Sequence, residues 1–222
     1  MYESIRTGEP AFDQIYGKHF FDYLADHPED AEIFNASMTA HHNPATISVV
    51  AEGYDFSRFS TIVDIGGGHG ALLQGILAAN PKLRGILFDL PEVVAGAKPA
   101  PPAIAGRFEI AGGDFFDSVP GGADAYMIRS VLGDWKDEDA LRILRTCRRA
   151  ILPNGTLVLL ETLVESQDGR PNGSWGDLLM FVLAGGRERT LSELEALLAA
   201  AGFSAPSLII NQGRSIMESH PV

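Results

Sequence analysis

The chain of 222 residues contains a single cysteine, Cys147. One cysteine cannot form an intramolecular disulfide, so a reducing, cytoplasmic location is predicted. The apolar spacing of Leu141, Leu144 and Ile151 places Cys147 on the buried face of a helix, where a thiol is inert. No apolar run approaches about 20 residues, so no membrane-spanning helix is predicted. The N-terminal sequence also lacks the basic and then apolar pattern of a signal peptide.

Basic side chains are scarce, because 17 Lys and Arg stand against 29 Asp and Glu. Phosphate binding requires a local excess of Lys and Arg, so nucleic acid is excluded as a partner. The arginines of residues 142–149 follow the acids of residues 137–139, an order that suits the dipole of a solvated helix. The six histidines show no metal-ligand spacing, so no metal is predicted, and His19, His27 and His220 are expected at the surface.

The sequence does contain an alternation of short apolar strands and helices after residue 60. Strands are predicted at five places, which are residues 61–65, 85–90, 107–114, 123–130 and 155–163. Strands that alternate with helices pair in parallel through right-handed crossovers. Two further runs, residues 206–211 and 214–219, have no helix between them and are expected to form an antiparallel hairpin at one side of the sheet.

The first sixty residues are predicted to be helical. Apolar and aromatic side chains recur at helical spacing from Phe12 to Leu24, and two more helices are expected over residues 26–38 and 46–52. The chain is therefore predicted to consist of two parts, a helical segment over residues 1–60 and an α/β domain over residues 61–222. Near the C-terminus, Thr190 and Glu193 form a capping box for a helix that ends at Gly202. The Gly- and Pro-rich residues 166–174 suggest a mobile lid.

The strongest chemical signal is the sequence VDIGGGHG at residues 63–70, which leaves the first predicted strand and enters a helix. Gly66, Gly68 and Gly70 allow a sharp turn and a close approach of a ligand to the backbone. Their spacing is GxGxG, whereas dinucleotide-binding folds have GxGxxG, so a nicotinamide-dependent oxidoreductase is disfavoured. A tight turn without a ligand is the structural alternative.

Acidic residues follow the glycine loop at the ends of the next two strands. Asp89 could accept both hydroxyls of a ribose, and Asp114 could accept a hydrogen bond from an adenine amino group, with Phe115 beside the ring. Either acid alone is more often a cap or a solvated loop residue. Together with the glycines they occupy successive strand ends, the rim where open sheets bind ligands. Asp64 suits a ligand with a cationic end, and S-adenosylmethionine is such an adenosine ligand.

Five motifs occur in order along nearly the whole chain: VDIGGGHG, FDLPEVV, GDFFDSVP, IRSVLGDWKDEDALRILRTCRRAI and GGRERTLSELEALLAAAGF. In these motifs the chain resembles the class I S-adenosylmethionine-dependent O-methyltransferases of the plant caffeate and bacterial polyketide-tailoring type. The resemblance implies an α/β fold with a Rossmann-like, doubly wound sheet of seven strands, mostly parallel with an antiparallel C-terminal hairpin. It also implies metal-independent methyl transfer from S-adenosylmethionine to a hydroxyl of an aromatic small molecule.

The resemblance assigns roles to individual residues. The predicted cofactor-binding residues are Asp64, Gly66, Gly68, Asp89, Leu90, Asp114, Phe115, Arg129 and Trp135. Among them, Gly66 would contact the methionine portion of the cofactor and Trp135 would pack near the adenine. Phe34 and Met38 match positions that line the acceptor pocket in the family, so the helical segment is expected to line that pocket.

The stretch SVLGDW, residues 130–135, departs from the family at one position. Family members usually carry a histidine directly before the Asp-Trp pair, where it deprotonates the acceptor hydroxyl, and here that position is Gly133. The acids that normally orient this histidine are present as Glu161 and Glu188, and burial would raise their pKa values and make them candidate bases. His41, with His42 beside it, is the other candidate, although adjacent loop histidines are more often solvated.

The loss of the base predicts a slower enzyme. Positioning of the reacting atoms supplies ~7–11 kcal/mol of barrier reduction, whereas a general base adds only about 10²–10⁴-fold. Acidic acceptors would be favoured over a plain phenol, whose pKa is ~10. The alternative is a family member that binds S-adenosylmethionine but no longer methylates, and instead hydroxylates, decarboxylates or only binds.

The second departure from the family is the length of the chain. Family members begin with a winged-helix domain that forms the dimer and contributes to the acceptor pocket. This chain starts at the linker-like YESIRTGEPAFDQ, so that domain is expected to be absent. A homodimer is then expected to be weakened, because surface that the domain would cover is exposed.

Overall fold

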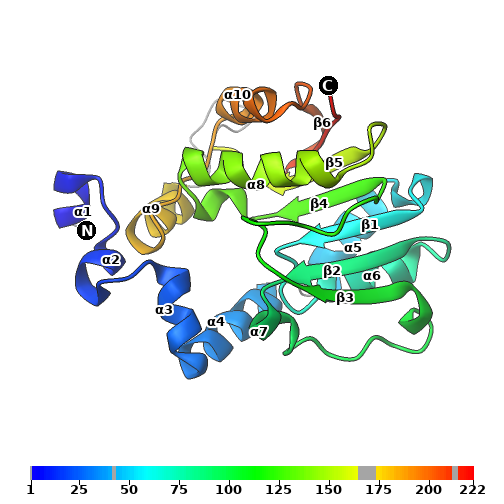
Figure 1. Cartoon of the computed structure of the whole chain (residues 1–222), viewed down its shortest axis with the longest axis horizontal. Coiled ribbons are helices and arrows are strands. Elements are labelled where there is room, and N and C mark those ends of the chain that lie inside the picture. The colour runs from blue at the N-terminus through cyan, green and yellow to red at the C-terminus, as the bar shows by residue number, and fades with distance from the viewer. Residues whose placement is uncertain (1, 42–43, 165–173, 212–214) are drawn as a thin grey trace.

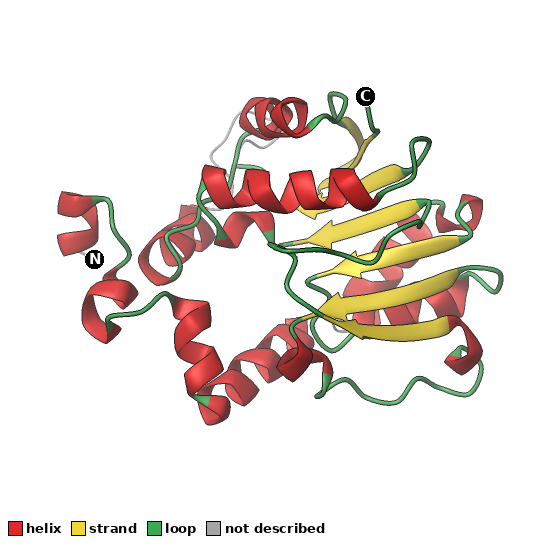
Figure 2. Cartoon of the chain, in the orientation of Figure 1, coloured by secondary structure: helices red, strands yellow, loops and turns green. Residues whose placement is uncertain are grey.

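The computed structural model describes residues 2–41, 44–164, 174–211 and 215–222. A twisted sheet lies at the centre, and helices cover both of its faces (Figures 1 and 2). A series of short helices, drawn in blue in Figure 1, extends away from the sheet at the end where the parallel strands finish. We call residues 2–41 the N-terminal arm.

The N-terminal arm contains four helices, which are α1 (Tyr2–Thr7), α2 (Ala11–Tyr16), α3 (Phe20–Asp26) and α4 (Pro28–His41). The single helix expected from Phe12 to Leu24 is therefore wrong, because Gly17 adopts a left-handed conformation (φ 72°) that ends α2. Aromatic rings join the two halves, since Phe12 stacks on Tyr16 at 4.4 Å and meets Phe20 edge to face at 5.1 Å. The next helix, α5 (Pro44–Gly53), packs on α6 (Ala71–Ala79).

The sheet has seven strands in the order β3-β2-β1-β4-β5-β7-β6. Their bounds are β1 (Thr61–Ile65), β2 (Arg84–Asp89), β3 (Phe108–Gly112), β4 (Ala125–Arg129), β5 (Thr156–Glu161), β6 (Ser207–Asn211) and β7 (Ser215–Ser219). The first five strands pair in parallel, β7 pairs antiparallel with β5, and β6 pairs antiparallel with β7. The predicted fold class is confirmed, including the C-terminal hairpin.

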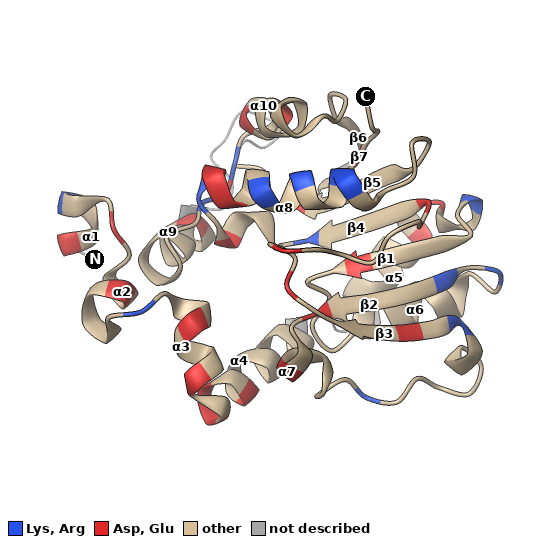
Figure 3. Ribbon diagram, in the orientation of Figure 1, with Lys and Arg blue, Asp and Glu red and all other residues tan. Residues whose placement is uncertain are grey.

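The remaining helices lie between these strands along the chain. They are α7 (Pro91–Val94), α8 (Asp137–Ala150), α9 (Ser174–Leu183) and α10 (Leu191–Ala201), the last two of which are consecutive, with short 3-10 turns η1 (Phe56–Arg58), η2 (Ala105–Arg107) and η3 (Leu132–Asp134). The predicted capping box of Thr190 and Glu193 starts α10, and Gly202 ends it in a left-handed conformation. Figure 3 shows the expected order of charge on α8, with acids at its start and arginines along its length.

The core divides into two clusters because side chains alternate across each strand. Val63 and Ile65 of β1 face the cluster that α8 and α10 cover, whereas Ile62 faces the cluster under α5 and α6. All six residues of β5 are buried, as expected of a strand covered on both faces. Cys147 is a buried free thiol in the first cluster, as expected from its helical spacing, and burial raises its pKa to about 12.

Two further observations concern only the described residues. None of their helices is long and apolar enough to cross a membrane. No group of three or more His, Cys, Asp or Glu side chains among them could hold a metal ion.

Candidate active site

The glycine loop follows β1 at the edge where the parallel strands end, and β1 lies between β2 and β4 at the point where the strand order reverses. The N–H groups of Gly66 and Gly67 donate to the carbonyl of Phe88 at the end of β2, at 2.9 and 3.3 Å. Gly66 has a φ of +67°, and a Cβ there would lie 2.7 Å from Val131 Cγ2. The loop therefore requires glycine at this position and presents its backbone to the rim of the sheet.

Asp89 is held in a fixed orientation beside this loop. Its Oδ2 accepts the N–H of Gly68 and its Oδ1 accepts the N–H of Leu90, both at 2.8 Å. A carboxylate oxygen has two acceptor sites, so each oxygen can accept a further hydrogen bond. This arrangement fits a pair of ribose hydroxyls. Burial raises the pKa of Asp89, against the effect of these two backbone bonds.

Asp64 lies beneath the loop with 2% of its surface exposed. A Cβ placed on Gly67 would come within 2.7 Å of Asp64 Oδ2, which shows how closely the loop covers this carboxyl. Burial first, and then repulsion from Asp89, raise the pKa of Asp64 to about 7. A buried carboxyl of this kind gains most from a cationic group placed against it.

Asp114 follows β3, and its Oδ1 accepts the N–H of Phe116 at 2.7 Å, so the carboxylate is fixed in an exposed turn. The ring of Phe116 meets Trp135 edge to face at 4.7 Å, and Phe115 meets the same ring at 6.0 Å. The structure thus brings three of the predicted adenine-side residues, Asp114, Phe115 and Trp135, to one part of the rim.

The N-terminal arm also contacts Trp135. Phe21 stacks on the indole at 5.3 Å and His19 at 5.1 Å. His19 Nε2 lies 3.0 Å from the carbonyl oxygen of Ala184, and its ring is half-buried. The expected surface position of His19 is therefore wrong, because α3 folds back onto the turn that carries Trp135 and covers one face of the imidazole.

The backbone is strained where β4 enters this turn. Arg129, the last residue of β4, is buried. Ser130 after it has a φ of +50° and is the one non-glycine residue in the described part of the chain with a positive φ. Such strain is commonly found at functional sites. Sequence reasoning missed Ser130, since a φ angle leaves no mark in the residue type here.

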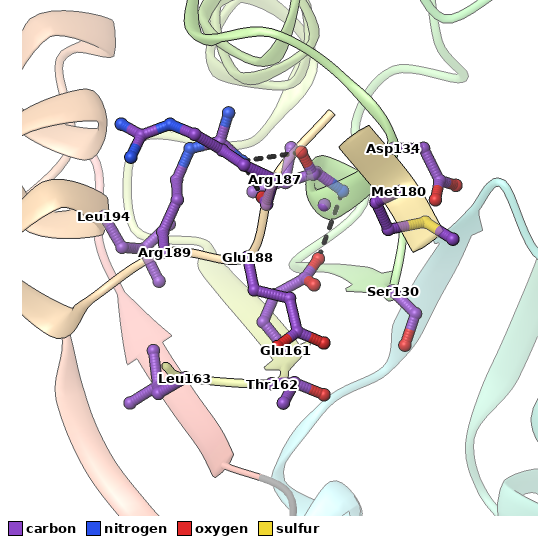
Figure 4. Close-up of a pocket in the computed structure, with 12 residues that line it drawn as sticks. Ser130, Asp134, Glu161, Thr162, Leu163, Met180, Arg187, Glu188, Arg189 and Leu194 are labelled. Atoms are coloured by element: carbon purple, nitrogen blue, oxygen red, sulfur yellow. Dashed lines mark hydrogen bonds between the residues drawn. The ribbon is translucent and has the colours of Figure 1, made fainter. Parts of the chain in front are cut away.

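A small pocket opens next to the strained turn, with a volume of about 90 Å³ (Figure 4). Residues that follow β4, including η3, and residues from the end of β5, from α9, from the segment before α10 and from α10 itself line it: Ser130, Leu132, Gly133, Asp134, Glu161, Thr162, Leu163, Met180, Arg187, Glu188, Arg189 and Leu194. Gly133, Glu161 and Glu188 therefore lie together, although they come from three different segments. A Cβ on Gly133 would meet only the carbonyl oxygen of Arg187, at 3.9 Å, so a side chain has room there.

Glu161, at the end of β5, binds the backbone of the turn that follows β4. Its Oε1 accepts the N–H groups of Val131 and Leu132, at 3.3 and 3.2 Å. Burial raises the pKa of Glu161 to about 7, although these bonds and the positive charge of Arg189 favour its ionised form.

Glu188 is differently placed, because its Oε2 is buried and has no hydrogen-bond partner among the described residues. Its backbone N–H donates to Asp177 on α9 at 2.8 Å. Burial and then repulsion from Asp177 raise the pKa of Glu188 to about 7. Asp134, which sequence reasoning did not single out, also lines the pocket, and burial followed by repulsion from Glu161 raises its pKa to about 8.

The predicted acceptor residues lie on α4, away from this pocket. Phe34 meets Phe20 edge to face at 5.2 Å and Phe21 at 6.1 Å, and Met38 is 41% exposed. Neither side chain lines the pocket around Gly133. Helix α4 ends at His41, whose side chain lies outside the described part of the chain, as do all of His42 and residues 166–173 of the expected lid.

The family described as an O-methyltransferase domain matches residues 1–204. The chain belongs to this family. An O-methyltransferase domain with the loop and acids described above leaves no support for the nicotinamide-dependent alternative.

Relatives of this O-methyltransferase domain are known from bacteria. The phenazine O-methyltransferase of Lysobacter antibioticus is 40% identical over 222 residues, which cover 99% of this chain and 65% of the relative. The O-demethylpuromycin-O-methyltransferase of Streptomyces alboniger is 41% identical over 228 residues, covering 99% and 61%. The chain thus spans somewhat under two thirds of the length of these relatives.

A solved structure gives the same result. An O-methyltransferase from neocarzinostatin biosynthesis, in complex with S-adenosylmethionine and 2-hydroxy-5-methyl naphthoic acid, superimposes with a TM-score of 0.88 at 34% identity. The match covers 100% of this chain and 66% of that one.

Proposed function

We propose that the chain transfers a methyl group from S-adenosylmethionine to a hydroxyl of an aromatic small molecule, without a metal. The observation that carries this proposal is the rim of the sheet. There the glycine loop, with the oriented carboxylate of Asp89 beside it, approaches Val131, which precedes Leu132 of the pocket lined by Glu161 and Glu188. The phenazine and neocarzinostatin relatives are O-methyltransferases by name, which supports an aromatic acceptor.

When bound, S-adenosylmethionine supplies a methyl group attached to a positively charged sulfur. The residues that would hold it are Asp64, Gly66, Gly68, Asp89, Leu90, Asp114, Phe115, Arg129 and Trp135. Within this set, the buried carboxyl of Asp64 suits the ammonium of the methionine end, and the two oxygens of Asp89 suit the ribose. The rings of Phe115 and Trp135 offer an apolar wall for the adenine.

Within the pocket, Glu188 is the preferred base. Its buried Oε2 needs a donor, whereas Glu161 already accepts two backbone N–H groups and holds the turn. With a pKa of about 7, Glu188 can take the proton of an acidic hydroxyl. A plain phenol, with a pKa of ~10, would lose its proton to this carboxylate far less readily. Phe34, Met38 and His41 remain part of the proposal as acceptor-side residues, with the helical segment as one wall.

Methyl transfer to phenols of graded acidity tests this function. The purified chain is mixed with S-adenosylmethionine that carries a labelled methyl group and with phenol or its para-nitro derivative. We expect faster transfer to the more acidic para-nitrophenol, and an equal rate for both would contradict the role of acceptor acidity. A calorimetric titration with S-adenosylhomocysteine accompanies it, and Asp89→Ala should abolish the binding.

The alternative from the sequence is a family member that binds S-adenosylmethionine without transferring its methyl group. The relatives described above are methyltransferases by name, so this alternative is not favoured. Binding of S-adenosylhomocysteine with no methyl transfer to any phenol would restore it.

The proposal also includes an oligomeric state and a cellular location. Self-association as a homodimer is supported by exposed apolar side chains on α1, α2 and α9, namely Tyr2, Ile5, Ile15 and Trp175. Sedimentation of the purified chain would show a monomer if this is wrong. A cytoplasmic location is proposed from the single cysteine, and fractionation of the source cells would test it.

A further inference from the structure

Arg189 is a buried cation in a segment that also lines the proposed acceptor pocket. It lies between α9 and α10, and its side chain is only 4% exposed. Its backbone is fixed to the chain just after β5, because the N–H of Val164 donates to its carbonyl at 3.1 Å. Taking a charged side chain out of water is unfavourable unless its donors are satisfied, and a buried ion pair rarely adds net stability.

The guanidinium of Arg189 contacts both ends of one turn. Its Nη1 donates to the carbonyl of Leu132 at 2.6 Å, and its Nη2 donates to the carbonyl of Trp135 at 2.8 Å. Its Nε donates to Asp137 Oδ1 at 3.0 Å, in the first turn of α8. A planar guanidinium fixes the relative positions of such acceptors, which the single ammonium of lysine cannot do.

The turn held in this way connects the two halves of the proposed site. Between Leu132 and Trp135 it contains Gly133 and Asp134, which line the acceptor pocket, and Trp135 itself meets the ring of Phe115, on the adenine side, edge to face at 6.0 Å. From the other side, Glu161 accepts the N–H of Leu132. Arg189 and Glu161 therefore bind the same turn through its carbonyl and N–H groups respectively, as the dashed lines in Figure 4 show.

The charge of Arg189 also acts on Glu161. Burial raises the pKa of Glu161, and the nearby cation of Arg189 opposes that rise. The ionised carboxylate is the form that best accepts the two backbone N–H groups of the turn. Removal of the cation would therefore weaken the hydrogen bonds from Glu161 to the turn, in addition to removing those from Arg189 itself.

We propose that Arg189 is a positioning residue for methyl transfer, which holds the Leu132–Asp134 turn so that the acceptor pocket and the aromatic wall of the cofactor cleft stay aligned. This inference rests on the proposed function for its effect on catalysis. Its effect on the turn and on Glu161 is independent of any acceptor.

The test compares Arg189→Met and Arg189→Lys with a matched control, Arg148→Met. Arg148 also donates to backbone carbonyls, at Gly202 and Val222, but it lies in the last turn of α8 and is not one of the pocket-lining residues. The measurements are amide hydrogen exchange at Val131 and Leu132, the titration of Glu161 by carbon NMR, and kcat and KM for transfer to para-nitrophenol.

For Arg189→Met we expect faster amide exchange at the turn, an upward shift of the Glu161 titration, and a kcat lower by about 100-fold, the usual consequence of a displacement of about 1 Å. S-adenosylhomocysteine should still bind. Arg189→Lys retains the charge, so it should restore the Glu161 titration while kcat stays low. Arg148→Met should change only the melting temperature.

Wild-type exchange, wild-type Glu161 titration and wild-type kcat in a folded Arg189→Met protein would overturn the inference. If Arg189→Met does not fold, Arg189→Lys decides alone, since an unchanged kcat there would show that the planar contacts do not matter. If the wild-type chain methylates no phenol, the proposed function fails, and amide exchange and the Glu161 titration still decide the role of Arg189.

Discussion

The proposed cofactor side and the proposed acceptor side of the sheet rim are built in different ways. On the cofactor side, backbone groups of the chain itself fix the geometry, because Gly66 donates to Phe88 and Asp89 accepts from Gly68 and Leu90. On the acceptor side, side chains from distant segments meet, and the buried carboxyl of Glu161 and the half-buried Asp134 and Glu188, all with raised pKa values, line the pocket. A binding surface made by local backbone tolerates change elsewhere, whereas one made by converging side chains depends on every segment that supplies them.

The largest effect should come from Gly133→His, which supplies an imidazole on the acceptor side. A Cβ there has room, so the variant should fold, and a general base should increase transfer to phenol by about 10²–10⁴-fold. The measurement is the rate of labelled methyl transfer, with S-adenosylhomocysteine affinity unchanged. Gly121→His is the control, because a Cβ there likewise meets only a carbonyl oxygen at 3.9 Å, far from the pocket-lining residues. A folded Gly133→His protein with no gain would place the acceptor elsewhere.

An intermediate effect is expected from Gly66→Ala on the cofactor side. The methyl group would lie 2.7 Å from Val131 in a left-handed backbone conformation, so strain and crowding act together. Costs of ~1–2 kcal/mol for the conformation and ~1–3 kcal/mol for crowding predict S-adenosylhomocysteine binding weaker by roughly 100-fold, measured by calorimetry.

The control Gly122→Ala separates the cost of the left-handed conformation from the cost of crowding. Gly122 also has a positive φ (+82°), but nothing lies within 4 Å of its Cβ position. Its substitution should lower the free energy of unfolding by ~1–2 kcal/mol and leave the binding intact. If the Gly66→Ala protein binds S-adenosylhomocysteine as tightly as the wild-type chain does, the glycine loop does not hold the ligand.

The smallest effect concerns pH and Asp64. Its pKa is raised from 3.8 to about 7 in the folded chain, so its ionisation destabilises the fold as pH rises through that interval. An ammonium group placed against it favours the ionised form, so S-adenosylhomocysteine affinity should rise toward pH 7 by less than about tenfold per pH unit. Calorimetry at several pH values measures this rise, and Asp64→Asn should flatten it. A wild-type affinity that falls toward pH 7 would contradict the contact.

The same contrast explains what the sequence could predict. The strands, the hairpin and the capping box of Thr190 depend on neighbours in the chain, and the structure agrees with all of them. The grouping of Gly133, Glu161 and Glu188 was implied by a family resemblance and is found in one pocket. The contact of His19 with Trp135 was not predictable, because it depends on the break at Gly17 and on how the arm folds back. Ser130 and Arg189 were not predictable for a similar reason. The positive φ of Ser130 leaves no pattern in the neighbouring residues, and the burial of Arg189 depends on acceptors that lie more than 50 residues away in the sequence.

The stacking of Trp135 has an optical consequence. The chain has two tryptophans, and the other, Trp175, is 75% exposed. Trp175 should emit at long wavelength and be quenched readily by acrylamide, whereas the indole of Trp135 is shielded by Phe21, His19 and Phe116. The shielded part of the emission is therefore an intrinsic reporter of whether the N-terminal arm contacts the residue that follows the Leu132–Asp134 turn, and it can be recorded without any added label.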